Sequence, residues 1–215
     1  MTSSLQIDKL KIMRDQVPLL ALNETIAGGD VLSIMGPSGS GKSTMLNWLA
    51  GMLPHGFCAD GELYLNGKNI THLPSYQRRL GLLYQDALLF PHLSVADNIA
   101  FAMPKEDKAV RREKIAKGLK DLGLVNLENR GPESLSGGQQ ARVALLRVLL
   151  SQPKAILLDE PFSKLDSQLR QETRQLVFQQ ISQHQLPAII VTHDESDALA
   201  ANGKVIVLDA TPKHS

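Results

Sequence analysis

The 215-residue sequence predicts an α/β fold with a mainly parallel sheet, an N-terminal antiparallel β subdomain and an inserted α-helical lobe. Apolar and polar residues alternate in the first part of the chain, which is typical of antiparallel strands with one buried face. Residues 86–150 carry apolar side chains at helical spacing. Short apolar runs and a helical pattern then alternate, as in parallel α/β folds. We expect one domain over residues 1–215, with 1–85 and 151–215 as the core and 86–150 as the helical lobe.

The first part of the chain contains strand patterns, one helix and one hairpin. Strands are predicted at residues 5–13, 19–27, 30–35 and 80–84. A helix is predicted over residues 42–50, because Gly51 ends the apolar helical pattern. The Asn66-Gly67 pair lies between alternating residues and predicts a tight β-hairpin over residues 61–70.

The later part changes first to helices and then back to strands. Ser94 is predicted to cap a helix that ends at Pro104, and a second helix follows over residues 105–122. After Pro153, strands are predicted at residues 155–159, 188–192 and 205–209, with a long helix near residues 165–183. Continuous apolar runs of this kind predict a parallel sheet that is covered on both faces.

The composition limits the possible partners. The 23 Lys and Arg residues and the 22 Asp and Glu residues leave a net charge of +1, which gives no electrostatic reason to expect nucleic acid or an acidic membrane surface as the main partner. The single cysteine, Cys58, excludes an internal disulfide and fits a reducing compartment. The N-terminus lacks the pattern of a secretory signal, and no stretch reaches about 18 consecutive apolar residues. We therefore expect any membrane role to act through a partner.

Residues 36–44, GPSGSGKST, fit the phosphate-loop pattern G-x-x-x-x-G-K-[ST] between a predicted strand and a predicted helix. The glycines let backbone N–H groups point at a phosphate, and the helix N-terminus adds partial positive charge. Lys42 can reach the β- and γ-phosphates, and Ser43 can coordinate Mg²⁺. The pattern predicts a P-loop NTPase core; the alternative is a glycine-rich turn that binds nothing. The predicted nucleotide-binding residues of the loop are Gly36, Pro37, Ser38, Gly39, Ser40, Gly41, Lys42, Ser43 and Thr44.

Polar side chains end three further predicted strands. Asp159 and Glu160 follow one apolar run, and Gln85 and His193 each follow another. Ligands of open α/β sheets gather at the carboxyl ends of the strands, so we expect these side chains near the γ-phosphate. One carboxylate is expected to hold Mg²⁺ through water, and the next to face the attacking water. The two acids alone could equally be a strand end followed by a solvated turn, and a lone Gln or His at a strand end is more often a capping or loop residue. The prediction therefore depends on the whole set.

A second glycine pair lies in LSGGQ, residues 135–139, at the start of a predicted helix, and no lysine accompanies it. Ser136 is a good N-cap, and its hydroxyl and the amides of Gly137 and Gly138 can donate to phosphate oxygens. The predicted ligand set is Ser136, Gly137, Gly138 and Gln139. This set forms half of a phosphate site; the alternative is a Ser-Gly-Gly turn that only starts a helix.

These motifs together resemble the ATP-binding-cassette (ABC) ATPases, in the family's own order. They are the phosphate loop, Gln85, LSGGQ, ILLDEP at 156–161, SKLD at 163–166 and VTHD at 191–194. The resemblance covers nearly the whole chain and implies an ATPase that uses ATP and Mg²⁺. It implies a head-to-tail dimer in which each ATP lies between the phosphate loop of one chain and LSGGQ of the other. The implied catalytic residues are Glu160, His193, Gln85 and Lys42, the implied metal ligands are Ser43, Gln85 and Asp159, and Asp166 is implied to contact the other chain.

The segment DALLFPHLSVADNIAF at 86–101 resembles the same segment in the ATPases of binding-protein-dependent importers. Among these importers, the chain is most similar to the small ATPases that serve thiamine, iron, sulfate and molybdate transporters. This resemblance implies membrane permease subunits as partners, a substrate-binding protein as an indirect partner and no nucleic acid. It implies a peripheral position on the cytoplasmic face of the inner membrane. An apolar docking surface is then expected from Leu88, Leu89, Phe90 and Leu93; alternatively these four pack inside the helical lobe.

The sequence departs from the family at two points. Members usually place an aromatic residue in the first strands to stack on adenine, whereas here no Phe, Tyr or Trp precedes Trp48, and Met13 or its neighbours take that place. We expect aliphatic packing there or none, and we expect Met13→Tyr to tighten ATP binding. The chain also ends at Ser215, which predicts that it has no C-terminal regulatory domain.

Two other functions explain less of the sequence. A soluble ABC-type ATPase that acts on DNA or ribosomes is expected to carry a long coiled-coil insertion, a second cassette or a basic face, and the sequence contains none of them. A P-loop kinase or GTPase explains the phosphate loop but leaves LSGGQ and His193 without a role.

Overall fold

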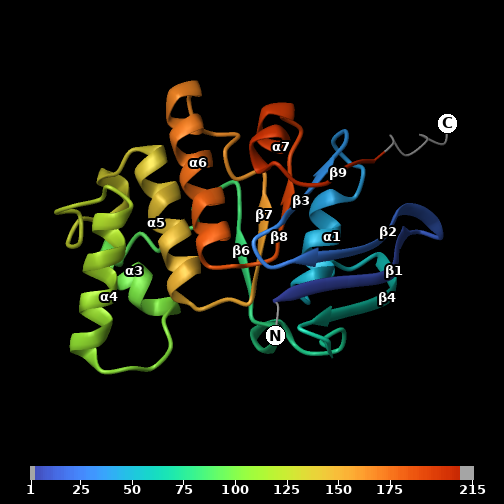
Figure 1. The fold of residues 1–215 in the computed structure, drawn as a ribbon, viewed down its shortest axis with the longest axis horizontal. Coiled ribbons are helices and arrows are strands. Elements are labelled where there is room, and N and C mark those ends of the chain that lie inside the picture. The colour runs from blue at the N-terminus through green and yellow to red at the C-terminus, as the bar shows by residue number, and fades with distance from the viewer. Residues whose placement is uncertain (1–2, 209–215) are drawn as a thin grey trace. The chain divides into compact units, whose positions relative to one another are not determined.

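The computed structural model describes residues 3–208, and their contacts divide them into two compact units. The first unit comprises residues 3–82, 154–160 and 178–208, and the second comprises residues 83–153 and 161–177. Figure 1 shows that the first unit contains the sheets and that the second is helical. This is the mixed α/β architecture that the sequence predicts.

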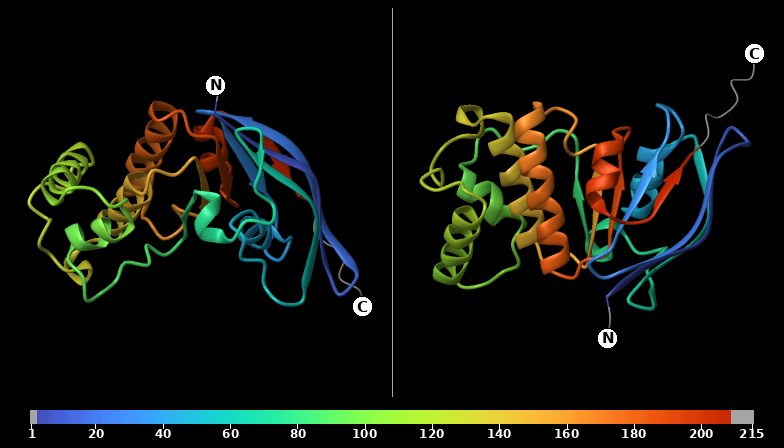
Figure 2. Two further views of the ribbon diagram at one scale, coloured as in Figure 1. Left: turned by 90° about the horizontal axis from the view of Figure 1, so that it is seen from below. Right: turned by 45° about the horizontal axis from the view of Figure 1, so that its top comes forward.

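A four-stranded antiparallel sheet forms part of the first unit, in the order β2-β1-β4-β5. Its strands are β1 (Ser4–Arg14), β2 (Val17–Ala27), β4 (Phe57–Leu65) and β5 (Lys68–Asn69). Figure 2 shows β1, β2 and β4 running side by side. At one end of this sheet Arg14 pairs with Val17 of β2 and with Phe57 of β4. The C-terminal end of β1 and the N-terminal ends of β2 and β4 therefore lie together at the same end of the sheet.

The hairpin between β4 and β5 forms at the predicted Asn66-Gly67 pair. Both residues have positive φ, 52° for Asn66 and 75° for Gly67. A two-residue type I′ turn requires this conformation at both central positions, and Asn and Gly adopt it at the least cost. The predicted hairpin is therefore confirmed.

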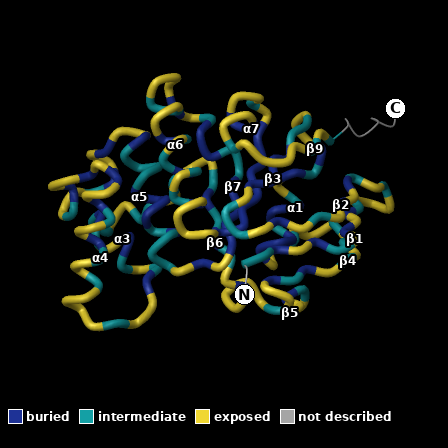
Figure 3. Tube along the Cα trace, in the orientation of Figure 1, coloured by how far each residue is buried: buried dark blue, intermediate teal, exposed yellow. Residues whose placement is uncertain are grey.

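The second sheet has five strands, in the order β6-β7-β8-β3-β9. They are β3 (Val31–Met35), β6 (Leu80–Leu83), β7 (Ala155–Asp159), β8 (Ala188–Val191) and β9 (Val205–Val207). β3 pairs in parallel with β8 and β9, and β7 pairs in parallel with β8. The apolar runs of β3, β7 and β8 are buried, as the dark tube in Figure 3 shows, which confirms a covered parallel sheet.

The expectation of cover on both faces is wrong for β9. This strand lies at the edge of the sheet, and its Val205 and Val207 side chains are 43% and 70% exposed. The two residues are two positions apart and therefore point to the same face, while Ile206 between them is partly buried. An apolar run at a sheet edge thus has only one covered face.

Helix α1 (Lys42–Leu49) is held at its C-terminal end by a buried arginine. Arg78 ends α2 (Ser75–Arg78), and its Nη1 donates 2.8 Å hydrogen bonds to the carbonyl oxygens of Trp48 and Leu49. These carbonyls belong to the last helical turn, where the usual donor four residues further on is missing and a cation is favoured by the helix dipole. The Trp48 carbonyl also accepts a 3.0 Å hydrogen bond from the Gly51 N–H. Burial lowers the pKa of the Arg78 guanidinium. Arg78 therefore fixes the end of α1 that is farthest from the phosphate loop.

The helical unit contains three complete helices and part of a fourth. They are α3 (Val95–Ala102), α4 (Lys108–Asp121), α5 (Gly137–Leu150) and α6 (Ser167–Gln183) up to residue 177, with a 3₁₀ turn at Pro132–Ser134. Ser94 caps α3, because its Oγ accepts a 3.1 Å hydrogen bond from the backbone N–H of Asp97, and this confirms the predicted helix start. The core of the unit includes Val95, Ile99, Leu119, Val143 and Leu146.

The boundary between the units differs from the predicted division, which assigned residues 151–215 to the core. Residues 161–177 group with the helical unit. Leu176 packs against its apolar core, and Glu172 forms a 3.0 Å ion pair with Arg142 of α5. The helical pattern near residues 165–183 was visible in the sequence, but the surface on which it packs was not.

Candidate functional site

The phosphate loop curls between β3 and α1, as its glycines predict. Gly39 and Gly41 have φ values of 85° and 89°, which side chains adopt only with strain. A Cβ atom on Gly41 would also come 3.2 Å from Leu20 Cδ2 on β2. Both positions therefore need glycine for the turn, and Gly41 also needs it for the close approach of β2.

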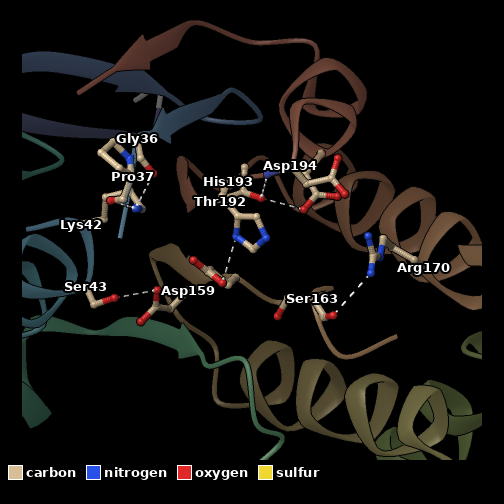
Figure 4. A network of polar contacts seen from close by, with 12 residues as sticks. Gly36, Pro37, Lys42, Ser43, Asp159, Ser163, Arg170, Thr192, His193 and Asp194 are labelled. Carbon is tan, nitrogen blue, oxygen red and sulfur yellow. Dashed lines mark hydrogen bonds and ion pairs between the residues drawn. The ribbon is translucent and has the colours of Figure 1, made fainter. Parts of the chain in front are cut away.

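Lys42 is buried against the loop that precedes it. Its Nζ donates hydrogen bonds of 2.7 Å to the Gly36 carbonyl oxygen and 2.8 Å to the Pro37 carbonyl oxygen, as Figure 4 shows. Burial lowers the pKa of the Lys42 ammonium, while the nearby carboxylates of Glu160 and Asp159 act in the opposite direction. A buried ammonium that donates to neutral carbonyl oxygens can donate to the charged oxygens of a phosphate group instead.

Ser43 and Asp159 meet although they are far apart in the sequence. The Ser43 hydroxyl donates a 3.1 Å hydrogen bond to Oδ1 of Asp159 at the end of β7 (Figure 4). Burial raises the pKa of the Asp159 carboxyl, the Ser43 hydroxyl lowers it, Glu160 raises it and Lys42 lowers it. A hydroxyl and a carboxylate are the hard oxygen donors that Mg²⁺ prefers.

The Ser43 hydroxyl and the Asp159 carboxylate suit a Mg²⁺ ion that binds together with a nucleotide better than one that the protein binds alone. Within residues 3–208, no group of three or more His, Cys, Asp or Glu residues is placed to hold a metal ion. Mg²⁺ at nucleotide sites usually takes one or two protein ligands, with phosphates and water completing its shell. Ser43 and Asp159 match that ligand number.

Glu160 and His193 lie at the ends of neighbouring strands. A carboxylate oxygen of Glu160 is 3.2 Å from Nδ1 of His193, whose side chain is 63% exposed. Glu160 has a φ of 45°, an uncommon backbone conformation for this residue type, and its N–H donates a 2.9 Å hydrogen bond to the carbonyl of Val191 on β8. The strand pairing therefore holds a strained backbone that aims this carboxylate toward His193.

The residues around His193 form a buried network that the sequence did not reveal. Thr192 is 1% exposed, and its hydroxyl donates a 2.8 Å hydrogen bond to Oδ2 of Asp197 on α7 (Glu195–Ala201). The same hydroxyl accepts a 3.1 Å hydrogen bond from the backbone N–H of Asp194. Thr192 therefore fixes the backbone on both sides of His193. A signal was present, because Asp194 and the following acids have the pattern of a helix N-terminus.

A pocket of about 310 Å³ lies against the phosphate loop, in a size range usual for small-molecule sites. Its lining residues are Arg14, Leu19, Ser38, Gly39, Gly41, Lys42, Ser43, Thr44, Phe57 and Glu160. The sequence pointed to Met13 or its neighbours, which include Arg14, but not to Leu19 or Phe57. These three pocket residues come from three strands of the antiparallel sheet, and only the strand register brings them together.

Met13 does not lie where the sequence analysis expected it to face a nucleotide. Met13 pairs with Cys58, and Arg14 pairs with Phe57, in the β1–β4 register. Because successive side chains of a strand point to opposite faces, Met13 faces away from the side that Arg14 and Phe57 occupy. A nucleotide contact from Met13 itself is therefore not supported, whereas its neighbour Arg14 lines the pocket.

Gln85 is an exposed residue of the helical unit, and it lies two positions after β6. Lys42, Ser43, Asp159, Glu160 and His193 belong to the first unit, in which they surround one region of space. The structure brings those five residues together and leaves the predicted catalytic and metal-binding roles of Gln85 as predictions.

The LSGGQ segment starts α5 with a capping box. The backbone N–H of Gln139 donates a 3.3 Å hydrogen bond to Ser136 Oγ, and the backbone N–H of Ser136 donates a 3.0 Å hydrogen bond to Oε1 of Gln139. Gln139 was predicted as a nucleotide ligand, and here its side chain closes the helix cap. The Ser136 hydroxyl accepts in the cap and retains its own proton for donation.

The two glycines of LSGGQ have different surroundings. A Cβ atom on Gly138 would lie 2.3 Å from Leu169 Cδ2 of α6, whereas one on Gly137 would meet its nearest neighbour, Leu165, at 3.9 Å. Gly138 is buried and Gly137 is exposed. Packing within the helical unit therefore accounts for one glycine and not for the other.

The apolar residues after Gln85 divide between the surface and the core. Leu88 is 57% exposed, whereas Leu89 packs against the core of the helical unit. Phe90 is partly buried and contacts the ring of Phe101, itself 69% exposed, with 4.9 Å between the centroids. Leu93 is partly buried. Leu89 thus packs inside the helical unit, whereas Leu88 is exposed, and its part in a docking surface stays a prediction.

No helix within residues 3–208 is both long enough and apolar enough to cross a membrane.

Comparisons with known proteins agree with this geometry. The ABC transporter family profile matches residues 19–163. The uncharacterized ABC transporter ATP-binding protein YnjD of Escherichia coli (strain K12) is 48% identical over 183 residues, which cover 85% of this chain and 84% of that protein. The thiamine import ATP-binding protein ThiQ of Haemophilus influenzae (strain 86-028NP) is 40% identical over 200 residues, 92% of each chain.

A longer relative and two solved structures extend the comparison. The Fe(3+) ions import ATP-binding protein FbpC of Agrobacterium fabrum (strain C58) is 41% identical over 194 residues, and the match covers 89% of this chain but only 54% of that protein. A dimeric bacterial ABC transporter cassette has a TM-score of 0.78 at 31% identity, over 95% of this chain and 94% of that one. A dimeric cassette in a post-hydrolysis state bound to ADP and Pi has a TM-score of 0.77 at 30% identity, over 97% of each chain.

Proposed function

The chain belongs to the ATP-binding-cassette transporter family, and we propose from this premise that it is the ATP-hydrolysing subunit of an importer. One observation carries the proposal: Lys42, Ser43, Asp159, Glu160 and His193 surround a single region beside the phosphate loop. The thiamine and iron import subunits among its relatives support import rather than export.

Lys42 and the loop amides bind the phosphates of ATP. Lys42 exchanges the carbonyl oxygens of Gly36 and Pro37 for β- and γ-phosphate oxygens, while the curled backbone presents its N–H groups to the same anion. The anionic phosphates also favour the charged form of this buried ammonium, which burial disfavours when the loop binds no anion.

Ser43 and Asp159 hold Mg²⁺ beside these phosphates. When bound, the ion would neutralise the charge that develops on the phosphates. The 3.1 Å contact between the two side chains keeps a hydroxyl oxygen and a carboxylate oxygen next to each other for this purpose. Gln85 stays a predicted further ligand.

Glu160 orients the water that attacks the γ-phosphorus in line and accepts a proton from it. The bond from the γ-phosphorus to the bridging oxygen then breaks, and ADP and phosphate form. His193 is 3.2 Å from the Glu160 carboxylate, so it can hold that carboxylate and contact the γ-phosphate. The strained Glu160 backbone keeps the carboxylate in place without a change at the moment of reaction.

A second copy of the chain completes the site with the N-terminus of its α5. The Ser136 hydroxyl and the amides of Gly137 and Gly138 supply donors without a lysine, because the lysine comes from the first copy. The dimeric cassettes with similar folds support this arrangement. Asp166 is a predicted contact across the same dimer.

Permease subunits in the membrane are the proposed partners of the ATPase dimer, and a substrate-binding protein is an indirect partner. The exposed Leu88 and Phe101 offer an apolar surface for a cytoplasmic segment of the permease. The chain would then lie peripherally on the cytoplasmic face of the inner membrane. ATP-driven closing and reopening of the dimer would move the permease.

The replacement Glu160→Gln tests the proposal. We expect ATP hydrolysis to fall at least about 100-fold, because the amide cannot accept the water proton. ATP binding should persist, and ATP should convert the variant from monomer to dimer in light-scattering measurements. Glu113→Gln, at an exposed position on α4, is the matched control and should keep wild-type turnover. Native turnover by Glu160→Gln would contradict the assigned role.

A further inference from the structure

A second pocket lies at the N-terminal end of β3, whereas the phosphate loop follows the C-terminal end of that strand. Its volume is about 330 Å³, close to that of the pocket beside the loop and in the range of small-molecule sites. Its walls come from β2, from the start of β3 and from the loop between α7 and β9. Its charged lining consists of Glu24, Asp30 and Lys204, and its apolar lining includes Ile26 and Leu32.

Glu24 places a carboxylate on the apolar face of β2. It pairs with Ile7 of β1, and residues paired in this way point to the same face of a sheet. Ile7 is fully buried, and Leu22 and Ile26, two positions to either side of Glu24, are buried as well. The Glu24 side chain is only 17% exposed. A carboxylate in such surroundings needs a cation beside it.

Lys204 supplies this cation from the solvent side. Its Nζ donates hydrogen bonds of 2.7 and 2.8 Å to the two carboxylate oxygens of Glu24, although the Lys204 side chain is 63% exposed. The Lys204 backbone is fixed, because its carbonyl oxygen accepts a 2.8 Å hydrogen bond from the N–H of Ser33. The loop also lies directly on β3, since a Cβ atom on Gly203 would come 1.9 Å from the Val31 carbonyl oxygen. The ammonium group can therefore leave Glu24 by rotation of its own side chain, without movement of the loop.

Asp30 gives the pocket a second carboxylate. It is exposed and has no ion-pair partner in the part of the chain that the structure describes. Two carboxylates and one ammonium leave the pocket with a net negative charge. Rotation of Lys204 away from the pocket would leave the two carboxylates beside the apolar side chains of Ile26 and Leu32.

We propose that this pocket binds a small aliphatic diamine. One ammonium group of the ligand replaces that of Lys204 on Glu24, and the other pairs with Asp30. The methylene groups lie against the apolar floor that Ile26 and Leu32 form. Both amino groups of such a ligand are protonated at neutral pH, as a lysine side chain is, so their charges match those of the two carboxylates. This site is separate from the phosphate loop, and the inference goes beyond the proposed function.

Glu24 and Lys204 could instead form a purely structural ion pair. β2 is an edge strand of the antiparallel sheet, and a charge that points inward on an edge strand hinders pairing with another chain. Loss of either partner would then lower stability, and neither loss would change the binding of a diamine. The proposal predicts opposite effects on diamine binding, because Glu24 attracts the ligand and Lys204 competes with it.

Isothermal titration calorimetry of the full chain without nucleotide, at constant ionic strength, tests the proposal. The probe is putrescine, a four-carbon diamine. We expect the wild type to bind putrescine with a Kd below about 1 mM and butylamine at least about tenfold more weakly, because the monoamine leaves one carboxylate unpaired. Butanediol, which has the same length but no charge, should not bind.

Three variants separate the roles of the charged residues. Glu24→Gln and Asp30→Asn should each weaken putrescine binding at least about tenfold, because each removes one charge-assisted contact. Lys204→Met should strengthen it at least about fivefold, because the competing ammonium is absent. Glu113→Gln on α4 and Lys68→Met on β5, both at exposed positions outside the pocket, are the matched controls and should bind putrescine as the wild type does.

Thermal melting gives a second measurement and checks folding. Lys204→Met leaves the Glu24 carboxylate unpaired, so we expect it to melt below the wild type and to regain more stability from putrescine than the wild type does. Absence of putrescine binding by the wild type, or unchanged or weaker binding by Lys204→Met, would overturn the proposal. Unchanged binding by Glu24→Gln, or by Asp30→Asn at its exposed position, would also overturn it. Each of these results leaves the proposed ATPase function untouched, because no nucleotide enters the measurement.

Discussion

Glu160 and His193 face each other at 3.2 Å from the ends of β7 and β8, which are neighbouring parallel strands. Each strand alone would end in an ordinary polar residue. Their parallel pairing places the carboxylate and the imidazole together, and the hydrogen bond from the Glu160 N–H to Val191 fixes their relative position. The contact between the two proposed catalytic side chains thus follows from the pairing of β7 with β8.

Removal of the imidazole should slow catalysis more than binding. We expect His193→Ala to lower ATP turnover about 100-fold or more, because Glu160 would lose the group that holds it. ATP affinity should change less than about threefold, since Lys42 and the loop amides remain. Steady-state kinetics and calorimetry measure the two effects. A variant with normal turnover but weak ATP binding would show that His193 serves binding instead.

Loss of the Thr192 hydroxyl should destabilise the backbone around His193. Thr192→Val keeps the shape but removes one hydrogen bond to Asp197 and one from the Asp194 N–H. Loss of one donor to the buried Asp197 carboxylate should cost about 1–3 kcal/mol in the free energy of unfolding. Urea denaturation measures this change, and Thr25→Val on the exposed face of β2 is the control. Equal stability of the two variants would contradict the structural role of the network.

Asp159 should make the stability of the nucleotide-free protein depend on pH. Its folded pKa is raised by burial, so the folded state binds more protons than the unfolded state, and stability is lost as the pH rises through the folded pKa. Asp159→Asn does not titrate, and we expect it to melt about 2–4 °C above the wild type at neutral pH. The difference should shrink as the pH approaches about 4, the usual range of Asp.

In the complex with ATP and Mg²⁺, we expect the order of thermal stability of the wild type and Asp159→Asn to be reversed. With ATP and Mg²⁺ the wild type should gain more thermal stability than Asp159→Asn, because the amide is a poorer metal ligand than the carboxylate. Melting curves over a pH series, with and without the ligands, measure both effects. Lower stability of Asp159→Asn than of the wild type in the ligand-free protein at neutral pH would contradict the assigned burial cost.

The two glycines of LSGGQ should respond differently to replacement by alanine. Gly138→Ala forces a methyl group against Leu169 and should cost about 1–3 kcal/mol of stability. Gly137→Ala has room within the chain and should melt normally, but its methyl group would face the phosphate of the other copy and lower turnover at least about tenfold. Thermal melting and ATPase assays separate the effects. Normal turnover in Gly137→Ala would argue against contact with a nucleotide.

Local patterns in the sequence predicted the parts of the site that lie within one segment. The phosphate loop, the cap at Ser136 and the Asn66-Gly67 turn each need only a few consecutive residues, so their chemistry is visible in a short window. The ends of β7 and β8 could be predicted because parallel strands present their carboxyl ends at one edge of a sheet.

Features that depend on register or on packing partners could not be predicted in this way. Arg14 and Phe57 are paired across strands, and a shift of one residue would place Met13 there instead. The exposure of β9 follows from its edge position, which its apolar run does not encode. The grouping of residues 161–177 with the helical unit depends on contacts of Leu176 and Glu172 that the helical period alone does not specify.

In the proposed ATPase cycle, the contacts of Lys42 with the Gly36 and Pro37 carbonyls would give this lysine hydrogen-bond acceptors between turnovers. When ADP and phosphate depart, the buried ammonium has acceptors at once, so product release does not leave an unsolvated charge behind. The same carbonyls compete with every incoming triphosphate and reduce its net affinity. The loop thereby exchanges tightness of binding for ease of release, which favours a motor that must reset after each cycle over one that stores its nucleotide.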